Sequence, residues 1–412
     1  MSNIVDSDRR KFLAIVSAYG LVCTLPGFVY KNNMFGDELG QNTSGAGETL
    51  DPNKYYFLLN ADLSGAFRYE GLQQLMAANI AVEELNKYKV FDKEVRIVIS
   101  DNQCDAQATK NSLKKIFDQP HSSNIIALVG GSSSHTTKIQ AEIATAQKLV
   151  HLAGVAQLSE AGQSANPTFT VFMSVEESAK ALLHSAQAKK YNKILALSHD
   201  YDWGRAQVTA QSKAAGQVGI SYENTFFDLH FYGSDLGRAI SDESLVSADA
   251  IIINQYGLDL LKTLAFLKAN KLAEGKTIYL PSISDSVRKA ADPGLFAGVE
   301  ALVNWNDQID SQSSHDFSNH FYKVYGTRPG QAAHQVFAQL SLFITSFGET
   351  KSFAPERISS VISTLSSADV FGLKVDFSSG AGFKTKKDLY LIKLGAQNEV
   401  VSSHIIAKEH LV

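Results

Sequence analysis

The sequence predicts an α/β fold with two doubly wound, parallel-sheet lobes joined by a hinge. Two observations lead to this prediction. From residue 54 onward, short runs of valine, isoleucine and leucine alternate with segments whose apolar residues recur at helical spacing. The alternation starts again near residue 175. Because strands covered by helices on both faces are apolar along their whole length, such runs indicate parallel sheets.

The first strand–helix pair shows the local pattern. The run YYFLLNA is followed by a segment in which Leu72, Leu75, Ala78, Val82 and Leu85 fall on one helical face. Later pairs repeat this order. They are VRIVIS with a helix over 106–118, NIIALVG with 135–147, KILALS with 203–217 and ADAIIIN with 258–270.

Composition and motifs limit the function classes. The chain has 412 residues, 44% of them hydrophobic, which is enough for two or three domain cores. Its net charge of -4 comes without a clustered basic face, so nucleic acid is excluded as a partner. The chain has no nucleophile elbow, zinc-protease motif, P-loop or complete dinucleotide fingerprint, so we predict no enzyme, cofactor or metal. His199 next to Asp200 is the one candidate acid–base pair.

The N-terminus predicts export. Arg9, Arg10 and Lys11 precede an apolar run, the layout of an export signal, and the stretch resembles a twin-arginine signal. An uncleaved membrane anchor and lipid attachment at Cys23 are the alternatives. We expect a periplasmic or other extracytoplasmic location.

We divide the chain at changes in composition and periodicity. The expected parts are an export signal over 1–30, a flexible linker over 31–53, a first lobe over 54–174 with a returning segment of about 303–363, and a second lobe over 175–302 with a C-terminal segment of about 364–412.

Five stretches in order resemble one known family. They are NADLSGAFRYEG, ISDNQCDAQAT, ALVGGSSSHTTKIQAEIA, HDYDWGRA and VYGTRPGQAAHQVFAQL. Together they are similar to the branched-chain amino-acid-binding proteins, the type I periplasmic receptors of ABC importers. The resemblance covers about residues 54–395 and implies a Venus-flytrap fold that closes on a small ligand. Asp62 stands where a proline is usual, and Trp203 where a tyrosine is usual.

The carboxyl ends of parallel strands predict the ligand site. Residues at these ends face the cleft between the lobes, so Trp203 is either a cleft wall or a core residue of its own lobe. Tyr256, Phe67 and Tyr69 either add aromatic surface to the same cleft or belong to the surface or core.

The serine-rich turn GGSSSHTTK is the second predicted contact. Ser134 or a neighbour would cap the helix that follows, and hydroxyl and backbone N–H groups there form an anion site. The resemblance places a ligand-binding serine at Ser134, with Ser133 as the adjacent candidate. The alternative is a plain helix cap. In the family, the position of Cys104 can pair with a cysteine in this turn. Here Ser133 stands in that place, so we expect a free, buried Cys104 thiol.

Two departures from the family bear on the ligand. Gln157, following Ala156, stands where amino-acid-binding members have a threonine, and the nearest candidate for the acid that pairs with an amino group is Asp285. A buried amine without an acid is costly. We therefore expect a less polar or aromatic ligand, such as an amide or an aromatic acid.

The expected function is capture of a small molecule and its delivery to the permease subunits of an ABC importer. The alternative is a ligand-sensing module that acts on a signalling or regulatory partner. Contact with the membrane is expected only through permease docking or through an uncleaved or lipidated N-terminus.

Overall fold

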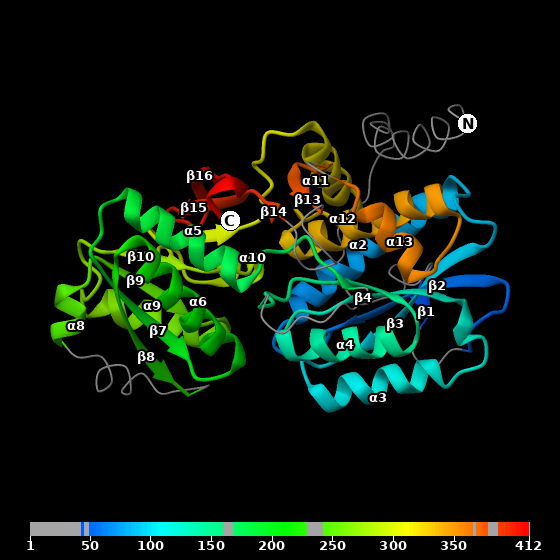
Figure 1. Ribbon diagram of the computed structural model, residues 1–412, viewed down its shortest axis with the longest axis horizontal. Coiled ribbons are helices and arrows are strands. Elements are labelled where there is room, and N and C mark those ends of the chain that lie inside the picture. The colour runs from blue at the N-terminus through cyan, green and yellow to red at the C-terminus, as the bar shows by residue number, and fades with distance from the viewer. Residues whose placement is uncertain are drawn as a thin grey trace. The chain divides into compact units, whose positions relative to one another are not determined.

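The computed structural model describes residues 43–44, 49–159, 168–228, 242–365, 368–377 and 386–411 (Figure 1). The predicted export signal, with Arg9, Arg10 and Cys23, lies outside the described residues, as does most of the predicted linker. The chain forms two compact units. The first unit comprises Met1–Ala156, Gln163–Phe172 and Trp305–Lys386, and the second Gln157–Gly162, Met173–Asn304 and Lys387–Val412. The predicted two-lobed α/β fold is confirmed.

The first unit has a six-stranded sheet in the order β1-β3-β2-β4-β5-β6, with every pair parallel. Its strands are β1 (Thr43–Ser44), β2 (Lys54–Ala61), β3 (Glu94–Asp101), β4 (Ile125–Gly130), β5 (Val150–Ala153) and β6 (Thr168–Phe169). Its helices are α2 (Arg68–Lys87), α3 (Ala106–Phe117), α4 (Ser134–Ala146), α11 (Gln312–Tyr325), α12 (Gln331–Thr350) and α13 (Pro355–Ile362). A short antiparallel hairpin of β12 (Ala368–Val370) and β13 (Leu373–Asp376) completes its described part.

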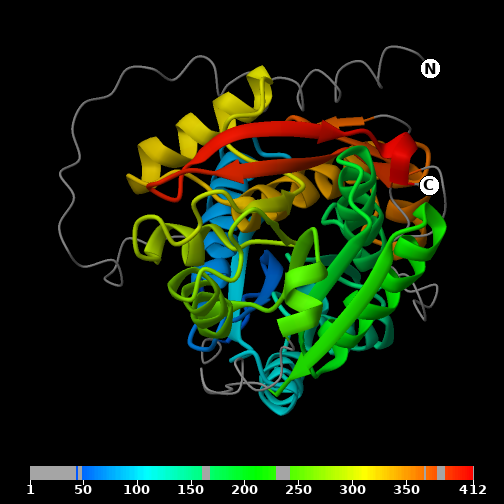
Figure 2. The ribbon, with the colours of Figure 1, turned by 90° about the vertical axis from the view of Figure 1, so that its left-hand side faces the viewer.

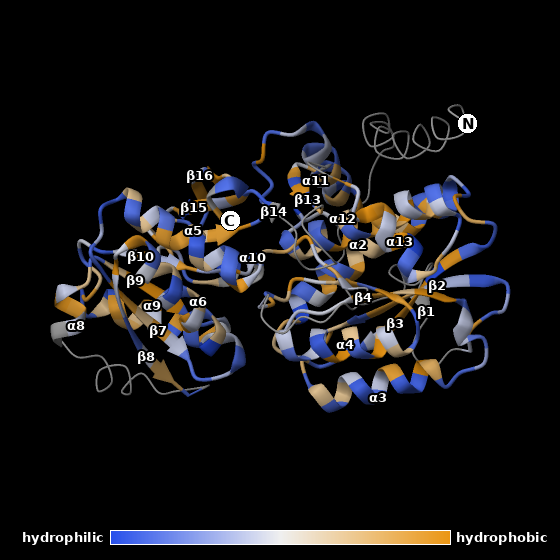
Figure 3. Cartoon of the chain, viewed as in Figure 1, coloured by the Kyte–Doolittle hydropathy of each residue, from blue (hydrophilic) through white to orange (hydrophobic). Residues whose placement is uncertain are grey.

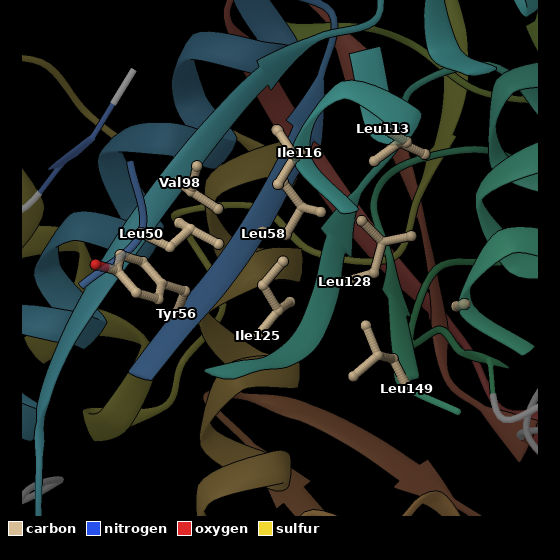
Figure 4. Close-up of a cluster of buried hydrophobic side chains, with 10 residues drawn as sticks. Leu50, Tyr56, Leu58, Val98, Leu113, Ile116, Ile125, Leu128 and Leu149 are labelled. Atoms are coloured by element: carbon tan, nitrogen blue, oxygen red, sulfur yellow. The ribbon is translucent and has the colours of Figure 1, made fainter. Parts of the chain in front are cut away.

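Apolar side chains fill both faces of this sheet, which explains its continuous hydrophobic runs. Figure 4 shows one face, where Leu58 and Leu128 of the central strands meet Leu113 and Ile116 of α3. On the other face the ring of Phe57 lies 5.6 Å from that of Phe343 in α12. Burying a side chain of this size contributes about 1.5–3 kcal/mol. The sheet therefore holds the strand ends, where the candidate residues lie, on a rigid base.

The second unit has a seven-stranded mixed sheet in the order β16-β15-β11-β10-β9-β7-β8. Its strands are β7 (Lys193–His199), β8 (Ser221–Phe227), β9 (Ala250–Asn254), β10 (Thr277–Leu280), β11 (Glu300–Val303), β15 (Leu389–Leu394) and β16 (Val400–Ile406). Its helices are α5 (Val175–Ala188), α6 (Asp202–Val218), α8 (Asp242–Ser247), α9 (Gly257–Ala269) and α10 (Asp285–Ala290). The strand β14 (Lys386–Lys387) stands where the chain enters this unit for the last time.

The C-terminal strands depart from the predicted all-parallel sheet. The pairs from β8 to β11 are parallel, whereas β15 is antiparallel to β11 and β16 to β15. Figure 2 shows β15 and β16 side by side near the C-terminus. Strands joined by a short turn pair antiparallel because a parallel pair needs a long crossover. The outer strand β16 is exposed over much of its length, and Ser402, Ser403 and His404 stand in its middle.

The hydropathy of the residues differs between the strands and the helices. In Figure 3 the strands are mostly hydrophobic, while the helices alternate between hydrophobic and hydrophilic residues. The described helices include none that is both long enough and apolar enough to cross a membrane.

Candidate functional site

The stretch HDYDWGRA forms a tight turn at the carboxyl end of β7 in the second unit. His199 ends the strand, Tyr201 is the N-cap of α6, and Trp203 is the second residue of that helix. Gly204 allows the turn, because a Cβ atom there would lie 2.0 Å from the carbonyl oxygen of His199. The turn places Trp203, which is half-buried, at the strand end.

Four rings gather at this end of the sheet, and we call them the aromatic cluster: His199, Tyr201, Trp203 and Tyr256. The centroids of the Tyr201, Trp203 and Tyr256 rings lie 5.9–6.4 Å apart, and the His199 ring lies 5.4 Å from that of Tyr256. Tyr256 follows β9 and is the N-cap of α9. Two neighbouring strands thus bring together residues more than fifty positions apart. The three larger rings are half-buried, so part of their surface remains open to solvent.

Gln157 lies beneath Trp203. Its side-chain carbonyl Oε1 accepts hydrogen bonds from Trp203 Nε1 at 3.0 Å and from Gln207 Nε2 at 2.7 Å. Its Nε2 lies 3.4 Å from the carbonyl oxygens of Ser174 and Pro281. Gln157 is only 5% exposed, so its amide is engaged inside the second unit.

The proposed acid–base pair of His199 and Asp200 is wrong. His199 Nε2 contacts Asp259 Oδ2 at 3.2 Å, and Asp259 Oδ1 accepts a hydrogen bond from Lys262 Nζ at 3.0 Å. Asp200 instead accepts from Arg205 Nε at 2.7 Å. His199 is 1% exposed, whereas Asp200 lies on the surface. The two neighbours therefore belong to separate ion-pair groups.

Asp285 is the first residue of α10 and forms an ion pair with a buried arginine. Its Oδ1 accepts from Arg288 Nη2 at 2.9 Å, and Arg288 Nη1 donates to the backbone oxygen of Asn398 at 2.6 Å. The Asp285 side chain keeps 30% of its surface exposed. A ligand amine at this carboxylate would share it with Arg288.

In the first unit, Asp62 organises the loop after β2. Its Oδ1 accepts from the backbone N–H of Gly65 at 2.6 Å and its Oδ2 from that of Phe67 at 2.7 Å. Phe67 is the half-buried N-cap of α2, and Tyr69 is 52% exposed with its hydroxyl 3.0 Å from Arg68 Nη2. The carboxylate therefore satisfies two backbone donors that would otherwise lack a partner within the loop.

The serine-rich turn follows β4. Gly130 and Gly131 have φ angles of 111° and 109°, which the turn into α4 requires. Ser133 is the N-cap of α4 and Ser134 its first residue. The Ser133 hydroxyl lies 2.7 Å from the Thr136 hydroxyl and does not bond a backbone N–H. The predicted cap is thus Ser133, and both serines lie at the positive end of the helix dipole.

Two further predicted residues lie beside these turns. Ala156 is buried at the end of the first unit's first segment. Cys104 follows β3 as a free thiol that hydrogen-bonds to the Ser133 side chain, and burial raises the pKa of this thiol. His135 Nε2 lies 2.9 Å from the carbonyl oxygen of Cys104. In the described part of the chain, no group of three or more His, Cys, Asp or Glu side chains is arranged to hold a metal ion.

The sequence comparison identifies the family. A family model described as periplasmic binding protein matches residues 58–398, most of the chain. The chain belongs to the periplasmic binding protein family. This confirms the predicted family and its role in ligand binding. A comparison with curated protein sequences finds no match.

Solved structures of periplasmic binding proteins share the fold of this chain. One is a branched-chain amino acid ABC transporter periplasmic ligand-binding protein from Burkholderia xenovorans LB400, with a TM-score of 0.74 and 15% identity over 87% of this chain and 96% of that chain. Another is a branched-chain amino acid transporter substrate-binding protein from Streptococcus pneumoniae in complex with isoleucine. Its TM-score is 0.72, with 14% identity over 86% of this chain and 99% of that chain.

A third relative was solved with an aromatic acid. It is a solute-binding protein of an ABC transporter from Rhodopseudomonas palustris BisB5 in complex with 3,4-dihydroxybenzoic acid, with a TM-score of 0.68 and 14% identity over 86% of this chain and 96% of that chain. At these identities the likeness shows the fold alone. Structures of this fold have thus been solved with both an aliphatic amino acid and an aromatic acid.

Sequence reasoning did not select Tyr201, Gln207 or Asp259. Tyr201 lies inside the quoted stretch HDYDWGRA, two positions before Trp203. Gln207 follows Trp203 by four positions, so helical spacing places both on one face of α6. Nothing in the local sequence indicates Asp259, whose contact with His199 joins the first turn of α9 to the end of β7.

Proposed function

We propose that this periplasmic binding protein captures a small organic ligand with a flat, apolar or aromatic group and delivers it unchanged to an ABC importer. The aromatic cluster of the second unit is the observation that supports this proposal most directly. Its three half-buried rings offer faces on which a ring or a branched aliphatic group can pack. Trp203 and Tyr256 are the proposed contacts.

The first unit offers a separate proposed contact, for a carboxylate or amide oxygen. Ser133 and Ser134 stand at the N-terminus of α4, where backbone N–H groups and the helix dipole favour a negative charge. We propose Phe67 and Tyr69, which follow β2, as further ligand contacts, whereas Ala156, which follows β5, is buried and offers almost no exposed surface. Aromatic acids are therefore the first ligand class to test, and amides the second.

Asp285 is a weaker candidate for an amine. Arg288 already neutralises much of its charge, so a ligand ammonium group would gain less there than at an unpaired carboxylate. This supports the preference for ligands without an α-amino group.

A thermal-shift screen of aromatic acids, amides and amino acids, followed by calorimetry, tests the proposal. Trp203→Ala should weaken binding of the best ligand roughly 30-fold or more, because burying a large aromatic side chain is commonly worth about 2–4 kcal/mol. The variant should remain folded, since Trp203 is half-buried and Gln157 Oε1 keeps its hydrogen bond from Gln207. Near-native affinity in Trp203→Ala would contradict the proposed contact between Trp203 and the ligand.

We also propose that residues 1–30 export the protein, by the twin-arginine route. The arginine pair followed by an apolar run supports this. Replacing Arg9 and Arg10 together by lysine should leave the precursor in the cytoplasm, as measured by cell fractionation. Undiminished delivery of the double variant would point to the general secretory route.

A further inference from the structure

The indole of Trp203 donates its N–H to the protein. Trp203 Nε1 lies 3.0 Å from Gln157 Oε1, and the same oxygen accepts from Gln207 Nε2 at 2.7 Å. An indole N–H can only donate, and it is the only polar atom of that side chain. The polar edge of Trp203 is therefore turned into the second unit.

The orientation of the Gln157 amide follows from its neighbours. Gln207 Oε1 accepts from Gln211 Nε2 at 3.1 Å, so the NH2 group of Gln207 must face Gln157. Trp203 also presents a donor. Flipping the Gln157 amide would set its NH2 group against two other donors, so the carbonyl must face them.

The chain of amides continues into the interior of the unit. Gln211 Nε2 donates to Asn254 Oδ1 at 2.8 Å, Asn254 Nδ2 donates to Ser198 Oγ at 2.9 Å, and Ser198 donates to Asn224 Oδ1 at 2.5 Å. Gln207, Gln211, Asn254 and Ser198 are fully buried. Because buried polar groups lose much free energy when a partner is removed, no member can rotate independently.

We infer that Gln157 and Gln207 are positioning residues that fix the Trp203 indole by its N–H, so that a ligand meets only the ring face. This inference rests on the proposed function, because the ring face matters only if Trp203 contacts ligand. Gln157 then orients the Trp203 ring and does not contact the ligand itself. The inference also bears on specificity. Because its N–H is already bonded to the protein, Trp203 favours apolar and aromatic groups of a ligand over hydrogen-bond acceptors.

The indole N–H resonances provide the test without any ligand. The chain has two tryptophans, so a ¹⁵N-labelled sample gives two indole signals, which Trp203→Phe assigns. In Gln157→Met the Trp203 signal should move upfield and exchange with water about tenfold faster or more, because its acceptor is gone. Gln157→Glu keeps two acceptor oxygens and should restore the signal. Gln207→Met should give a smaller change of the same sign.

Gln140→Met is the matched control. Gln140 is a fully buried glutamine of the first unit, where its Nε2 donates to the backbone oxygen of Asn60 at 2.7 Å. It should lose stability without moving the Trp203 signal. An unchanged Trp203 signal in folded Gln157→Met would overturn the inference, as would failure of Gln157→Glu to restore it. If Gln157→Met does not fold, an unchanged signal in Gln207→Met overturns it instead.

Binding measurements separate this inference from the proposed function. Calorimetry with 3,4-dihydroxybenzoate and with isoleucine should show a loss of about tenfold for the aromatic probe in Gln157→Met and less for isoleucine. If Trp203→Ala binds both probes as tightly as the wild type, the proposed contact between Trp203 and the ligand fails. If the wild type binds neither probe, the screen supplies another ligand for the same comparison. In both cases the indole signals still decide the positioning role. If Trp203→Ala loses the aromatic probe but Gln157→Met, with its indole signal moved, does not, the positioning role is overturned.

Discussion

At the scale of the residue, Asp62 shows how one carboxylate organises a loop. It stands where the family that the chain resembles usually has a proline. Its carboxylate accepts hydrogen bonds from the backbone N–H groups of Gly65 and Phe67. Asp62→Ala should lower stability by about 2–3 kcal/mol, because two donors lose a charged acceptor. Asp62→Asn keeps one acceptor and should lose less. Thermal unfolding checks the order, and equal losses in both variants would contradict it.

Cys104 gives a second prediction at this scale. Its thiol contacts the Ser133 side chain, so Ser133→Cys places two sulfur atoms within reach of each other. Mild oxidation of this variant should form a disulfide between position 133 and Cys104, detected by mass spectrometry of peptides. In the wild type, Cys104 should react slowly with iodoacetamide because burial raises the pKa of its thiol. Rapid alkylation, or no cross-link in the variant, would contradict the observed contact.

At the scale of the element, α6 offers two glycines with opposite expectations. Gly204→Ala would place a Cβ atom 2.0 Å from the carbonyl oxygen of His199, so the turn between β7 and α6 must shift at a cost of about 2–3 kcal/mol. Gly216 lies on the exposed face of the same helix with nothing within 4 Å of an added Cβ. Gly216→Ala should therefore stabilise the protein by about 1 kcal/mol.

Melting curves of the two variants check this pair. An increase in melting temperature in both variants would show that helix propensity, and not the close approach to His199, governs the turn. Gly204→Ala should also disturb the fluorescence of Trp203, since that residue directly precedes the displaced position.

At the scale of the whole molecule, two buried histidines make stability depend on pH. Burial lowers the pKa values of His151 and His334 to about 4, against about 6.5 when unfolded. Between these values the unfolded chain binds more protons, so the free energy of unfolding falls as the pH drops from about 6.5 to 4. Each histidine contributes up to roughly 3 kcal/mol of this loss.

Unfolding measured at pH 7 and pH 4.5 should show this acid destabilisation. His334→Gln removes one titrating group while keeping a donor for the carbonyl oxygen of Phe371, which lies 3.0 Å from His334 Nε2. The variant should lose less stability than the wild type over the same pH interval, whatever its stability at pH 7. An equal loss in both proteins would contradict the assignment to His334.

The alternation of strands and helices can be predicted from the sequence, because apolar periodicity is a local property of the chain. The helix predicted over 203–217 spans Asp202–Val218, and that over 106–118 spans Ala106–Phe117. The antiparallel β15 and β16 were not predicted, since pairing direction depends on which strand lies alongside.

The partners within the candidate site cannot be predicted in this way, because they depend on how distant segments pack. His199 and Asp200 are adjacent in sequence, but successive side chains at a strand end point to opposite sides, so His199 meets Asp259 and Asp200 meets Arg205. Gln157 likewise meets Trp203, 46 positions away, because the chain first enters the second unit at Gln157 and places its side chain against the start of α6. Local sequence patterns determine where strands end, whereas the packing of distant segments determines which side chains meet there.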